Sequence, residues 1–470
     1  MSTLVMKFGG SAVGTVSALT QVLSIVLHEH KHWQNLVLVA SALDGVTDML
    51  LEAAHLAQAA NQRGYRRIAA NLRTRHLALA ENLPLGTQER NALNAAIENL
   101  LFEMLDECQN IANKPSDGLS PEVSDRIIGV GERLSARVIA ALLRNNDLRG
   151  VAIDGTDVIL TNDVHGNATP YFDKTRERVQ QHLVPMLERQ IVPVVTGFIG
   201  ATLAGKPTTM GRGGSDYTAS VLAACINADE VWVWSDVDGM MSADPREVAD
   251  AVIIEEMSYN EVAELAYFGA RILHARMVQP LQERRIPLHV KNVYKPQMPG
   301  TLIRQSSPKY EDRVIAVATI SGISLTAQRS GSLVQITQII DNTLLETTGN
   351  ETDILITSQS AMQSFLCFIV PTHAGGYEIV NTILNKLREN ITNSSEATHW
   401  QVEQVTLVSA IGESLSQHHR LEASILEQLG TVRVHGYTRG SATCSLSVIV
   451  PPEDAMIALQ RIHDLTLSAK

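Results

Sequence analysis

A repeat in the last third of the chain sets the tightest limit on how it can fold. Residues 354–371 align without a gap with residues 434–451, at an offset of 80 residues. Each copy runs into an amphipathic helix and follows a strand and another helix, which predicts two βαββα units. We therefore expect two ferredoxin-like domains packed as a pair. Such pairs often bind an effector at a shared interface, and a dimerisation role is the alternative.

The first 300 residues instead alternate short apolar runs with helical patterns. This rhythm predicts an α/β domain with a parallel sheet, whose strands are covered on both faces. The predicted strands are residues 4–8, 36–40, 151–154, 191–196, 230–234 and 287–290. Residues 49–112 form a helical excursion with one break at Pro84–Gly86, and residues 121–145 form a further helix.

Length, charge and cysteine content restrict the class of protein. A chain of 470 residues is too long for one core, and its net charge of −12 argues against nucleic acid as the partner. There is no signal-peptide layout and no apolar run of membrane-spanning length. The four cysteines show no CxxC spacing, as in a reduced protein. We expect a cytoplasmic protein with a small-molecule ligand and no membrane partner.

A glycine-rich segment at residues 208–220 carries the strongest chemical signal. Arg212 and Asp216 stand among three glycines, and Ser215 and Asp216 open a predicted helix. Glycines allow close approach of the backbone, a helix N-terminus attracts anions, and Arg212 suits a carboxylate or phosphate. The alternative is a turn that Ser215 or Asp216 merely caps.

Two further loops follow predicted strands. Lys7 and the Gly9-Gly10-Ser11 segment lie where open α/β sheets bind phosphate, and the lysine can neutralise a phosphoryl group. Ser41–Thr47 follows the second strand, where an N-cap role competes with a ligand contact. The chain has neither a P-loop nor the protein-kinase motifs.

A third polar loop runs from Ser235 to Arg246. Its aspartates at 236, 238 and 244 suit a nucleotide or a metal, or Asp244-Pro245 begins a helix. Their spacing is not that of a calcium loop, and we assign no protein ligands to a metal. Residues 267–274 predict a helix from which Arg271 reaches a phosphate.

Taken in order, these motifs resemble those of the aspartate kinases, in the amino-acid kinase superfamily. The matching segments are Lys7–Ser11, Ser41–Thr47, Gly131-Glu132, Gly197–Gly200, Gly211–Ala219, Ser235–Arg246 and Phe268–His274. The resemblance covers the whole chain and implies a three-layer αβα kinase domain with a mainly parallel sheet over residues 1–305. Two ferredoxin-like ACT domains follow at 312–390 and 391–470, and the strand at 314–320 is assignable to either.

The resemblance implies that the γ-phosphate of Mg·ATP is transferred to the β-carboxylate of L-aspartate. It puts six residues on aspartate: Ser41, Thr47, Glu132, Phe198, Arg212 and Ser215. Around the nucleotide it puts Lys7, Gly9, Gly10, Ser11, Ser235, Asp236, Met241, Arg246 and Arg271. Lys7, Arg212 and Asp216 are the implied catalytic residues, with Asp216 orienting Lys7. The acceptor is already an anion, so catalysis needs positioning and charge neutralisation rather than a base, and Mg²⁺ is held mainly through the phosphates.

The chain departs from the family at three positions. Ala12 stands where Ser is usual, Met241 where Tyr is frequent and Arg271 where Lys is frequent. None of these changes removes a group that the chemistry requires, so we expect an active enzyme. The alternatives are a sibling kinase acting on glutamate or acetylglutamate, and an inactive amino-acid sensor.

The resemblance also implies regulation and assembly. Asp353, Thr357 and Ser358 lie where lysine-inhibited relatives bind their effector, so lysine is the expected inhibitor and threonine its rival. A homodimer or higher homo-oligomer through the ACT domains is expected. The implied reaction begins the pathway to lysine, threonine and methionine, and 470 residues leave no room for an appended dehydrogenase.

Overall fold

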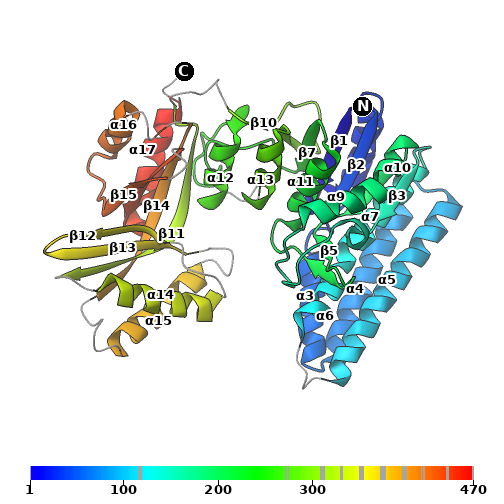
Figure 1. Ribbon diagram of the computed structural model, residues 1–470, viewed down its shortest axis with the longest axis horizontal. Helices are drawn as coiled ribbons and strands as arrows, with labels where there is room; N and C mark the ends of the chain where they lie inside the picture. Colours follow the sequence, from blue (N-terminus) through cyan, green and yellow to red (C-terminus); the bar gives the residue numbers. More distant parts are fainter. Residues whose placement is uncertain are drawn as a thin grey trace. The chain divides into compact units, whose positions relative to one another are not determined.

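The computed structural model divides the chain into two compact units. Unit 1 comprises Met1–Met240, Glu255–Tyr259 and Leu273–Gln305, and unit 2 comprises Met241–Ile254, Asn260–Ile272 and Ser306–Lys470. Each unit contains a sheet of its own (Figure 1). The structure describes residues 2–114, 119–269, 273, 275–306, 313–328, 332–348, 354–370, 377–393, 400–413, 415, 419–440 and 444–467.

Unit 1 is organised around a mainly parallel sheet, as predicted. In spatial order its strands are β3 (Gly150–Ile153), β4 (Val192–Thr196), β2 (Asn35–Ala40), β1 (Thr3–Phe8), β7 (Glu230–Ser235), β9 (Leu288–Asn292), β10 (Thr301–Arg304) and β8 (Glu256–Ser258). Every neighbouring pair is parallel except β9 and β10. All six predicted strands are therefore present. Short strands β8, β10, β5 (Ile199–Ala201) and β6 (Pro207–Thr209) were not predicted, because three or four residues carry too little periodicity.

Helices cover both faces of this sheet because successive side chains of a strand point to opposite sides. Leu4, Met6 and Phe8 of β1 join the core formed with α2 (Val16–Glu29) and α7 (Val130–Arg144). Val5 and Lys7 point to the other face, where α11 (Gly214–Ile226) packs against β1. Beside α11 lie α9 (Phe172–His182) and α13 (Ala275–Arg284). The shorter helices of unit 1 are α1 (Gly10–Val13), α6 (Pro121–Ile128), α8 (Gly155–Val158) and α10 (Val184–Glu188).

The predicted helical excursion consists of three helices rather than two. These are α3 (Val46–Gln58), α4 (Gln62–Asn82) and α5 (Thr87–Asn113), which pack side by side (Figure 1). The extra break falls at Ala59–Asn61, where Ala60 has a positive φ of 54° and the Asn61 side chain caps α4 through the Gly64 N–H. The predicted helix at 121–145 is likewise divided, into α6 and α7 at Gly129.

Unit 2 contains an antiparallel sheet that the sequence repeat predicted. Its order is β12 (Ile354–Gln359), β13 (Gln363–Ile369), β11 (Ala316–Gln328), β14 (Trp400–Ile411), β16 (Ser445–Val450) and β15 (Gly436–Arg439). The helices are α12 (Tyr259–Tyr267), α14 (Leu333–Thr348), α15 (Tyr377–Asn393), α16 (His419–Leu429) and α17 (Ala455–Leu467), with a 3₁₀ turn at Pro452–Asp454. Both copies of the repeat thus form two strands followed by a helix.

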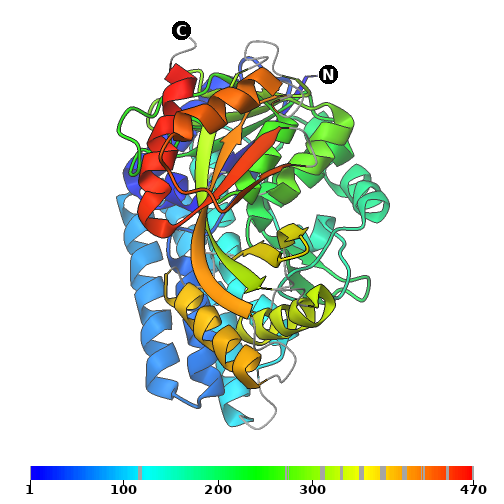
Figure 2. The same cartoon turned by 90° about the vertical axis from the view of Figure 1, so that its left-hand side faces the viewer.

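Strands β11 and β14 run through two hydrophobic cores. Ile323 and Leu325 of β11 pack with α14 and α15, whereas Val317 packs with α16 and α17. Figure 2 shows α16 and α17, in orange and red, over one part of the sheet and α14 and α15 over the other. Residues 316–320 of β11 pair with residues 407–411 of β14, beside the second core.

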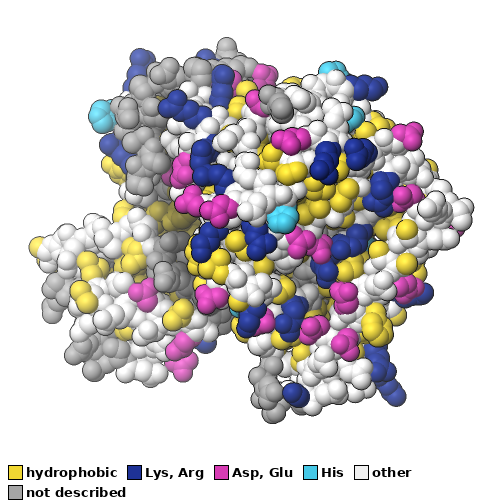
Figure 3. Space-filling view, turned by 45° about the vertical axis from the view of Figure 1, so that its right-hand side comes forward, with side chains coloured by type: hydrophobic (Ala, Val, Ile, Leu, Met, Phe, Trp, Pro, Cys, Tyr) yellow, Lys and Arg dark blue, Asp and Glu magenta, His cyan; other side chains and the backbone are white. Residues whose placement is uncertain are grey.

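The surface and the cysteines complete this description. Basic and acidic side chains are interspersed over the face shown in Figure 3. Within the described ranges, no helix has both the length and the apolar character needed to cross a membrane. Cys108, Cys225, Cys367 and Cys444 are buried thiols, as the sequence predicted.

Candidate active site

The loops that carry the predicted motifs meet at one edge of the parallel sheet. The register aligns Phe8 with Ala40 and Trp234, and Ala40 with Thr196, so four adjacent strands end at the same level. Backbone bonds tie the loops together there. Gly9 N–H donates to Trp234 O (3.0 Å), Ser41 N–H to Phe8 O (3.2 Å) and Gly197 N–H to Ala40 O (2.9 Å). This carboxyl edge is where open α/β sheets bind ligands.

A buried ion pair stands at the centre of this edge. Lys7 Nζ lies 2.6 Å from Asp216 Oδ1, and both side chains are almost fully buried. Lys7 belongs to the face of β1 that α11 covers, and Asp216 belongs to the first turn of α11. The carboxylate partner fixes the direction of the Lys7 side chain, which suits it to neutralise a bound phosphoryl group.

The start of α11 is not the simple capped turn that was the alternative. Gly213, with a positive φ of 70°, occupies the N-cap position, and no side chain of the described residues caps the helix. Ser215 and Asp216 instead lie inside the first turn, and Arg212 is exposed just before it. The helix therefore presents its N-terminal dipole, with an adjacent guanidinium, as an anion site would.

Two glycines allow these loops to approach one another. A Cβ on Gly10 would lie 2.9 Å from the carbonyl oxygen of Ala42, and one on Gly197 would lie 2.7 Å from Cβ of Ser215. Neither contact is possible for a real side chain, so the close approach of the Gly9–Ser11, Ser41–Thr47 and Ser215 segments requires glycine.

Glu132 is buried near the same edge with half of its carboxylate unsatisfied. Oε1 accepts a hydrogen bond from Ala42 N–H (3.2 Å), while Oε2 has no partner within the described part of the chain. Burial raises the pKa of Glu132 to about 8. An unpaired buried acceptor is costly, and a ligand that brings an ammonium or another donor would satisfy it.

The predicted nucleotide residues divide between the two units. Ser11 Oγ donates to Asp236 Oδ1 (3.1 Å), which joins the loops after β1 and β7, where Ser235 also lies. Asp238 is engaged by Lys295 Nζ (2.7 Å) and Asn292, and these hydrogen bonds, Lys295 first, lower the pKa of Asp238. Met241 and Arg246 belong to unit 2.

One alternative and one prediction about helices near these residues differ from the structure. The alternative in which Asp244-Pro245 begins a helix is excluded: Asp244 Oδ1 accepts from the Arg246 N–H (2.9 Å) in a tight turn and pairs with its guanidinium. The predicted helix at 267–274 is absent from the described residues of that segment, because α12 ends at Tyr267, Phe268 and Gly269 form a turn, and Gly269 has a φ of 102°. Arg271 and His274 lie outside the described residues.

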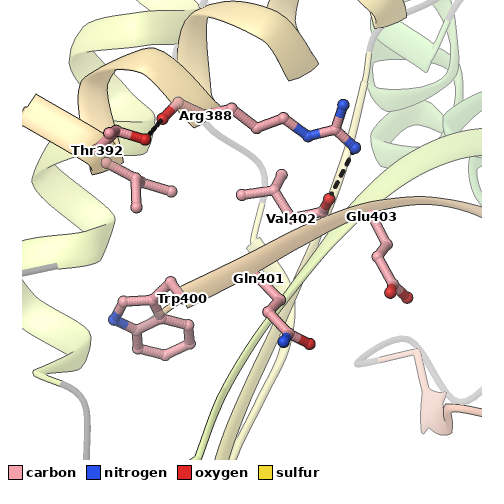
Figure 4. Close-up of a pocket in the computed structure, with 7 residues that line it drawn as sticks. Arg388, Thr392, Trp400, Gln401, Val402 and Glu403 are labelled. Atoms are coloured by element: carbon pink, nitrogen blue, oxygen red, sulfur yellow. Dashed lines mark hydrogen bonds between the residues drawn. The ribbon is translucent and has the colours of Figure 1, made fainter. Parts of the chain in front are cut away.

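The predicted effector residues lie in unit 2. Thr357 and Ser358 are exposed on β12, and Asp353 lies outside the described residues. A separate hollow of about 540 Å³ opens between α15 and β14 (Figure 4). Arg388 reaches across it to donate to Val402 O (3.1 Å), and neither Thr357 nor Ser358 lines it.

Comparison with known proteins identifies the family. The sequence pattern of the amino acid kinase family matches residues 2–292. The chain belongs to the amino acid kinase family. Lysine-sensitive aspartokinase 3 of Escherichia coli (strain K12) is 28% identical over 468 residues, which cover 98% of each chain.

A second relative is about twice as long. Bifunctional aspartokinase/homoserine dehydrogenase 1 of Arabidopsis thaliana is 27% identical over 479 residues, which cover 98% of this chain and 51% of the relative. The chain thus spans about half the length of the bifunctional relatives it matches.

Solved structures agree with this assignment. E. coli aspartokinase III in complex with aspartate and ADP (R-state) matches with a TM-score of 0.78 at 27% identity, covering 99% of this chain and all of the other. The same protein in complex with lysine and aspartate (T-state) matches with a TM-score of 0.77, covering 98% of each. These matches confirm the predicted fold class and the resemblance to aspartate kinases.

This amino acid kinase contains an anchor that sequence reasoning missed. Arg276 of α13 donates to Met210 O (2.8 Å), Asn167 Oδ1 (2.7 Å) and Ala168 O (3.1 Å), and its guanidinium lies 4.8 Å from the ring centre of Tyr217. It thereby holds the residue that precedes the Gly211–Gly214 loop. The Arg276 position gave no sequence signal, because its partners are 59 to 109 residues away.

Asp125 is a second missed anchor of the segment that leads to this loop. Its buried carboxylate accepts from Thr209 Oγ1 (2.5 Å) and the Gly166 N–H (3.0 Å), and it contacts His165 Nδ1 (2.9 Å). Asp125 and Arg276 together fix the segment that leads to Arg212. Asp125 is recognised by the burial of its carboxylate and by its three partners, and these features are visible only in the folded structure.

The pKa of Glu132 predicts a pH dependence of stability. The folded value of about 8 exceeds the ordinary value of 4.5, so stability is lost as pH rises between these values. We expect Glu132→Gln to raise the melting temperature of the ligand-free protein relative to wild type increasingly from pH 5.5 to 8.5. Exposed Glu177→Gln is the control, and parallel melting curves for Glu132→Gln would contradict the assignment.

The anchoring role of Arg276 predicts a local loss of protection. Arg276→Met leaves Met210 O and Asn167 Oδ1 without their charged donor, a loss of about 1.5–3 kcal/mol per bond. We expect amide hydrogen exchange at residues 162–170 and 209–214 to quicken about 10- to 100-fold, measured by mass spectrometry. Arg284→Met on the same helix is the control, and equal exchange in both variants would rule out the anchor.

Proposed function

We propose that this protein is an aspartate kinase that transfers the γ-phosphate of Mg·ATP to the β-carboxylate of L-aspartate. The observation that carries the proposal is the edge at which the Lys7–Asp216 pair, the Gly9–Ser11 loop and the unsatisfied Glu132 carboxylate meet. Similarity over the whole chain to E. coli aspartokinase III, solved with aspartate and ADP, supports the choice of substrates.

In this reaction a β-carboxylate oxygen of aspartate attacks the γ-phosphorus, and the bond from that phosphorus to the bridging oxygen breaks. The products are 4-phospho-L-aspartate and ADP, and the acceptor needs no base because it is already ionised. Lys7 offsets the charge on the transferring group, and Asp216 keeps the Lys7 ammonium in place. Catalysis then rests on positioning and charge neutralisation.

Aspartate itself presents an ammonium and two carboxylates. Arg212 pairs with a carboxylate through its planar fork, and Glu132 accepts from the ammonium through its free oxygen. Thr47, Ser41, Ser215 and Phe198 complete this subsite in our assignment. Burial raises the pKa of Glu132 to about 8. The ammonium of a bound aspartate favours the ionised carboxylate, so binding at neutral pH releases the proton of Glu132.

The nucleotide residues of unit 1 in our assignment are Gly9, Gly10, Ser11, Ser235 and Asp236. Met241, Arg246 and Arg271 are assigned to the nucleotide by the family resemblance alone. Mg²⁺ supplies neutralisation of the phosphate charge when it is bound with ATP. The residues fit this ion, which usually takes one or two carboxylates besides phosphates and water: Asp236 offers a carboxylate at this edge, held by Ser11.

We infer that lysine regulates the enzyme and that unit 2 assembles two or more copies. The lysine-sensitive E. coli relative supports this, as does the exposure of Thr357 and Ser358 on β12. The reaction then begins the pathway to lysine, threonine and methionine. Four buried thiols fit a reducing compartment such as the cytoplasm.

The first test is a coupled assay with aspartate, Mg·ATP and hydroxylamine, which traps an acyl phosphate. We expect Arg212→Ala to raise the aspartate KM about 10- to 100-fold, the cost of a lost charge-assisted bond, and to change the ATP KM far less. Arg178→Ala, an exposed arginine on α9, is the control. Turnover of glutamate or acetylglutamate but not aspartate would sink the proposal, and so would no turnover, which favours an amino-acid sensor.

The second test addresses the effector by isothermal titration. We expect lysine to release binding heat and threonine to release none, and we expect Thr357→Ala and Ser358→Ala to weaken lysine binding. Thr392→Ala, in the separate hollow of unit 2, serves as the control. No heat from lysine would remove the effector assignment while leaving the kinase activity untouched.

A further inference from the structure

Three metal-ligating side chains meet at the end of α2, away from the candidate active site. They are His28, Glu29 and His32, and one ligand atom of each lies within 4.8 Å of the other two. Glu29 is the last residue of α2, and the turn after it leads into β2. Helix α2 has 14 residues, so this turn lies about 20 Å along the helix from the end that follows the Gly9–Ser11 loop.

The rings of His28 and His32 lie close together, and the hydrogen bond of His32 leaves one of its ring nitrogens able to bind a cation. Their centroids are 4.6 Å apart with a tilt of 36°. His32 Nδ1 lies 2.9 Å from the carbonyl oxygen of His28, and because that oxygen can only accept, Nδ1 carries the proton. The lone pair of His32 is therefore on Nε2. Metal-bound histidines almost always donate their other ring nitrogen to a carbonyl or carboxylate in this way.

Glu29 supplies the third ligand and joins it to the first ring. Its Oε1 lies 3.0 Å from His28 Nδ1, and its side chain is only 13% exposed. A carboxylate in this position offsets the charge of an ion and fixes the direction of the neighbouring imidazole. Glu29 and His28 thus place a carboxylate oxygen and an imidazole ring close to the His32 side chain.

The backbone around the three ligands is held by the fold. The N–H groups of His32 and Trp33 both donate to Glu29 O (2.9 Å each), which closes the turn. Trp33 packs edge-on against Trp232 of β7, with ring centroids 6.2 Å apart, and Asn35 begins β2 two residues later. The turn that carries the three ligands is therefore already ordered, so binding an ion would cost little conformational entropy.

We propose that His28, Glu29 and His32 bind one divalent transition-metal ion of the zinc class, with water completing the coordination. Two imidazoles and one carboxylate are the ligands of zinc and its neighbours, whereas Mg²⁺ and Ca²⁺ prefer oxygen alone. The ion crosslinks the end of α2 to the turn that enters β2 and stabilises the folded chain by mass action. It has no part in phosphoryl transfer.

The test uses the full chain without an affinity tag, stripped with EDTA and free of nucleotide and amino acids. Isothermal titration with ZnCl₂ measures affinity and stoichiometry, and the melting temperature is followed with and without ZnCl₂. We expect one Zn²⁺ per chain and a raised melting temperature. Removing even an outer partner of a bound metal costs about 10- to 100-fold in affinity, so His28→Gln and His32→Gln should cost at least that.

His30→Gln is the matched control, since His30 belongs to the same histidine-rich segment but not to the cluster. We expect it to bind Zn²⁺ as wild type does, and MgCl₂ to leave the melting temperature unchanged. Absence of Zn²⁺ binding, equal loss in His30→Gln, or full binding in His32→Gln would each overturn the proposal. These readouts are independent of kinase activity, so the site stands or falls separately from the proposed function.

Discussion

The ion pair between Lys7 and Asp216 is the interaction on which the candidate site depends. Two charges are held almost out of solvent, and each is tolerable there only because the other is 2.6 Å away. Their meeting requires the pleat of β1, which turns Lys7 away from the Leu4–Phe8 core, and the start of α11 directly above it. A one-residue shift in the register of β1 would turn the Lys7 side chain into the opposite core. The position of the Lys7 ammonium in the candidate site therefore depends on the strand register.

The loops around this pair owe their positions to residues that touch no substrate in our assignment. Arg276 and Asp125 hold consecutive residues, Met210 and Thr209, of the segment that leads to Arg212, and Gly10 and Gly197 let neighbouring backbones approach. Loops on a rigid sheet edge are suited to binding because the fold orders them before a ligand arrives, so binding loses less conformational entropy. Glu132 completes the pattern as a buried carboxylate with one oxygen left for a ligand.

In unit 2, the two copies of the sequence repeat contribute strands to one continuous sheet. The two copies each form two strands and a helix, yet β11 and β14 pass through both hydrophobic cores. Residues 316–320 therefore pack beside the copy that is more distant in sequence. A ligand that moves one end of this strand pair acts on an element shared by both halves, which is a physical basis for coupling between them.

The sequence by itself determined the elements whose signal is local. Short apolar runs predicted the six core strands, the 80-residue offset predicted the two βαββα units, and the ordered motifs predicted the edge where Lys7, Gly10 and Asp216 meet. Each strand and each motif is a pattern of residues that are close in sequence, and the repeat is seen by comparing two segments of the same chain, so one sequence is enough to find them.

Only the tertiary structure decided what depends on distant partners. It alone revealed the raised pKa of Glu132, the anchors Arg276 and Asp125, and the breaks at Ala60 and Gly129. It also showed that His28, Glu29 and His32 lie close together although α2 ends at Glu29. Burial, hydrogen-bond partners and side-chain direction arise when segments 66 to 209 residues apart pack together, and no local pattern encodes them.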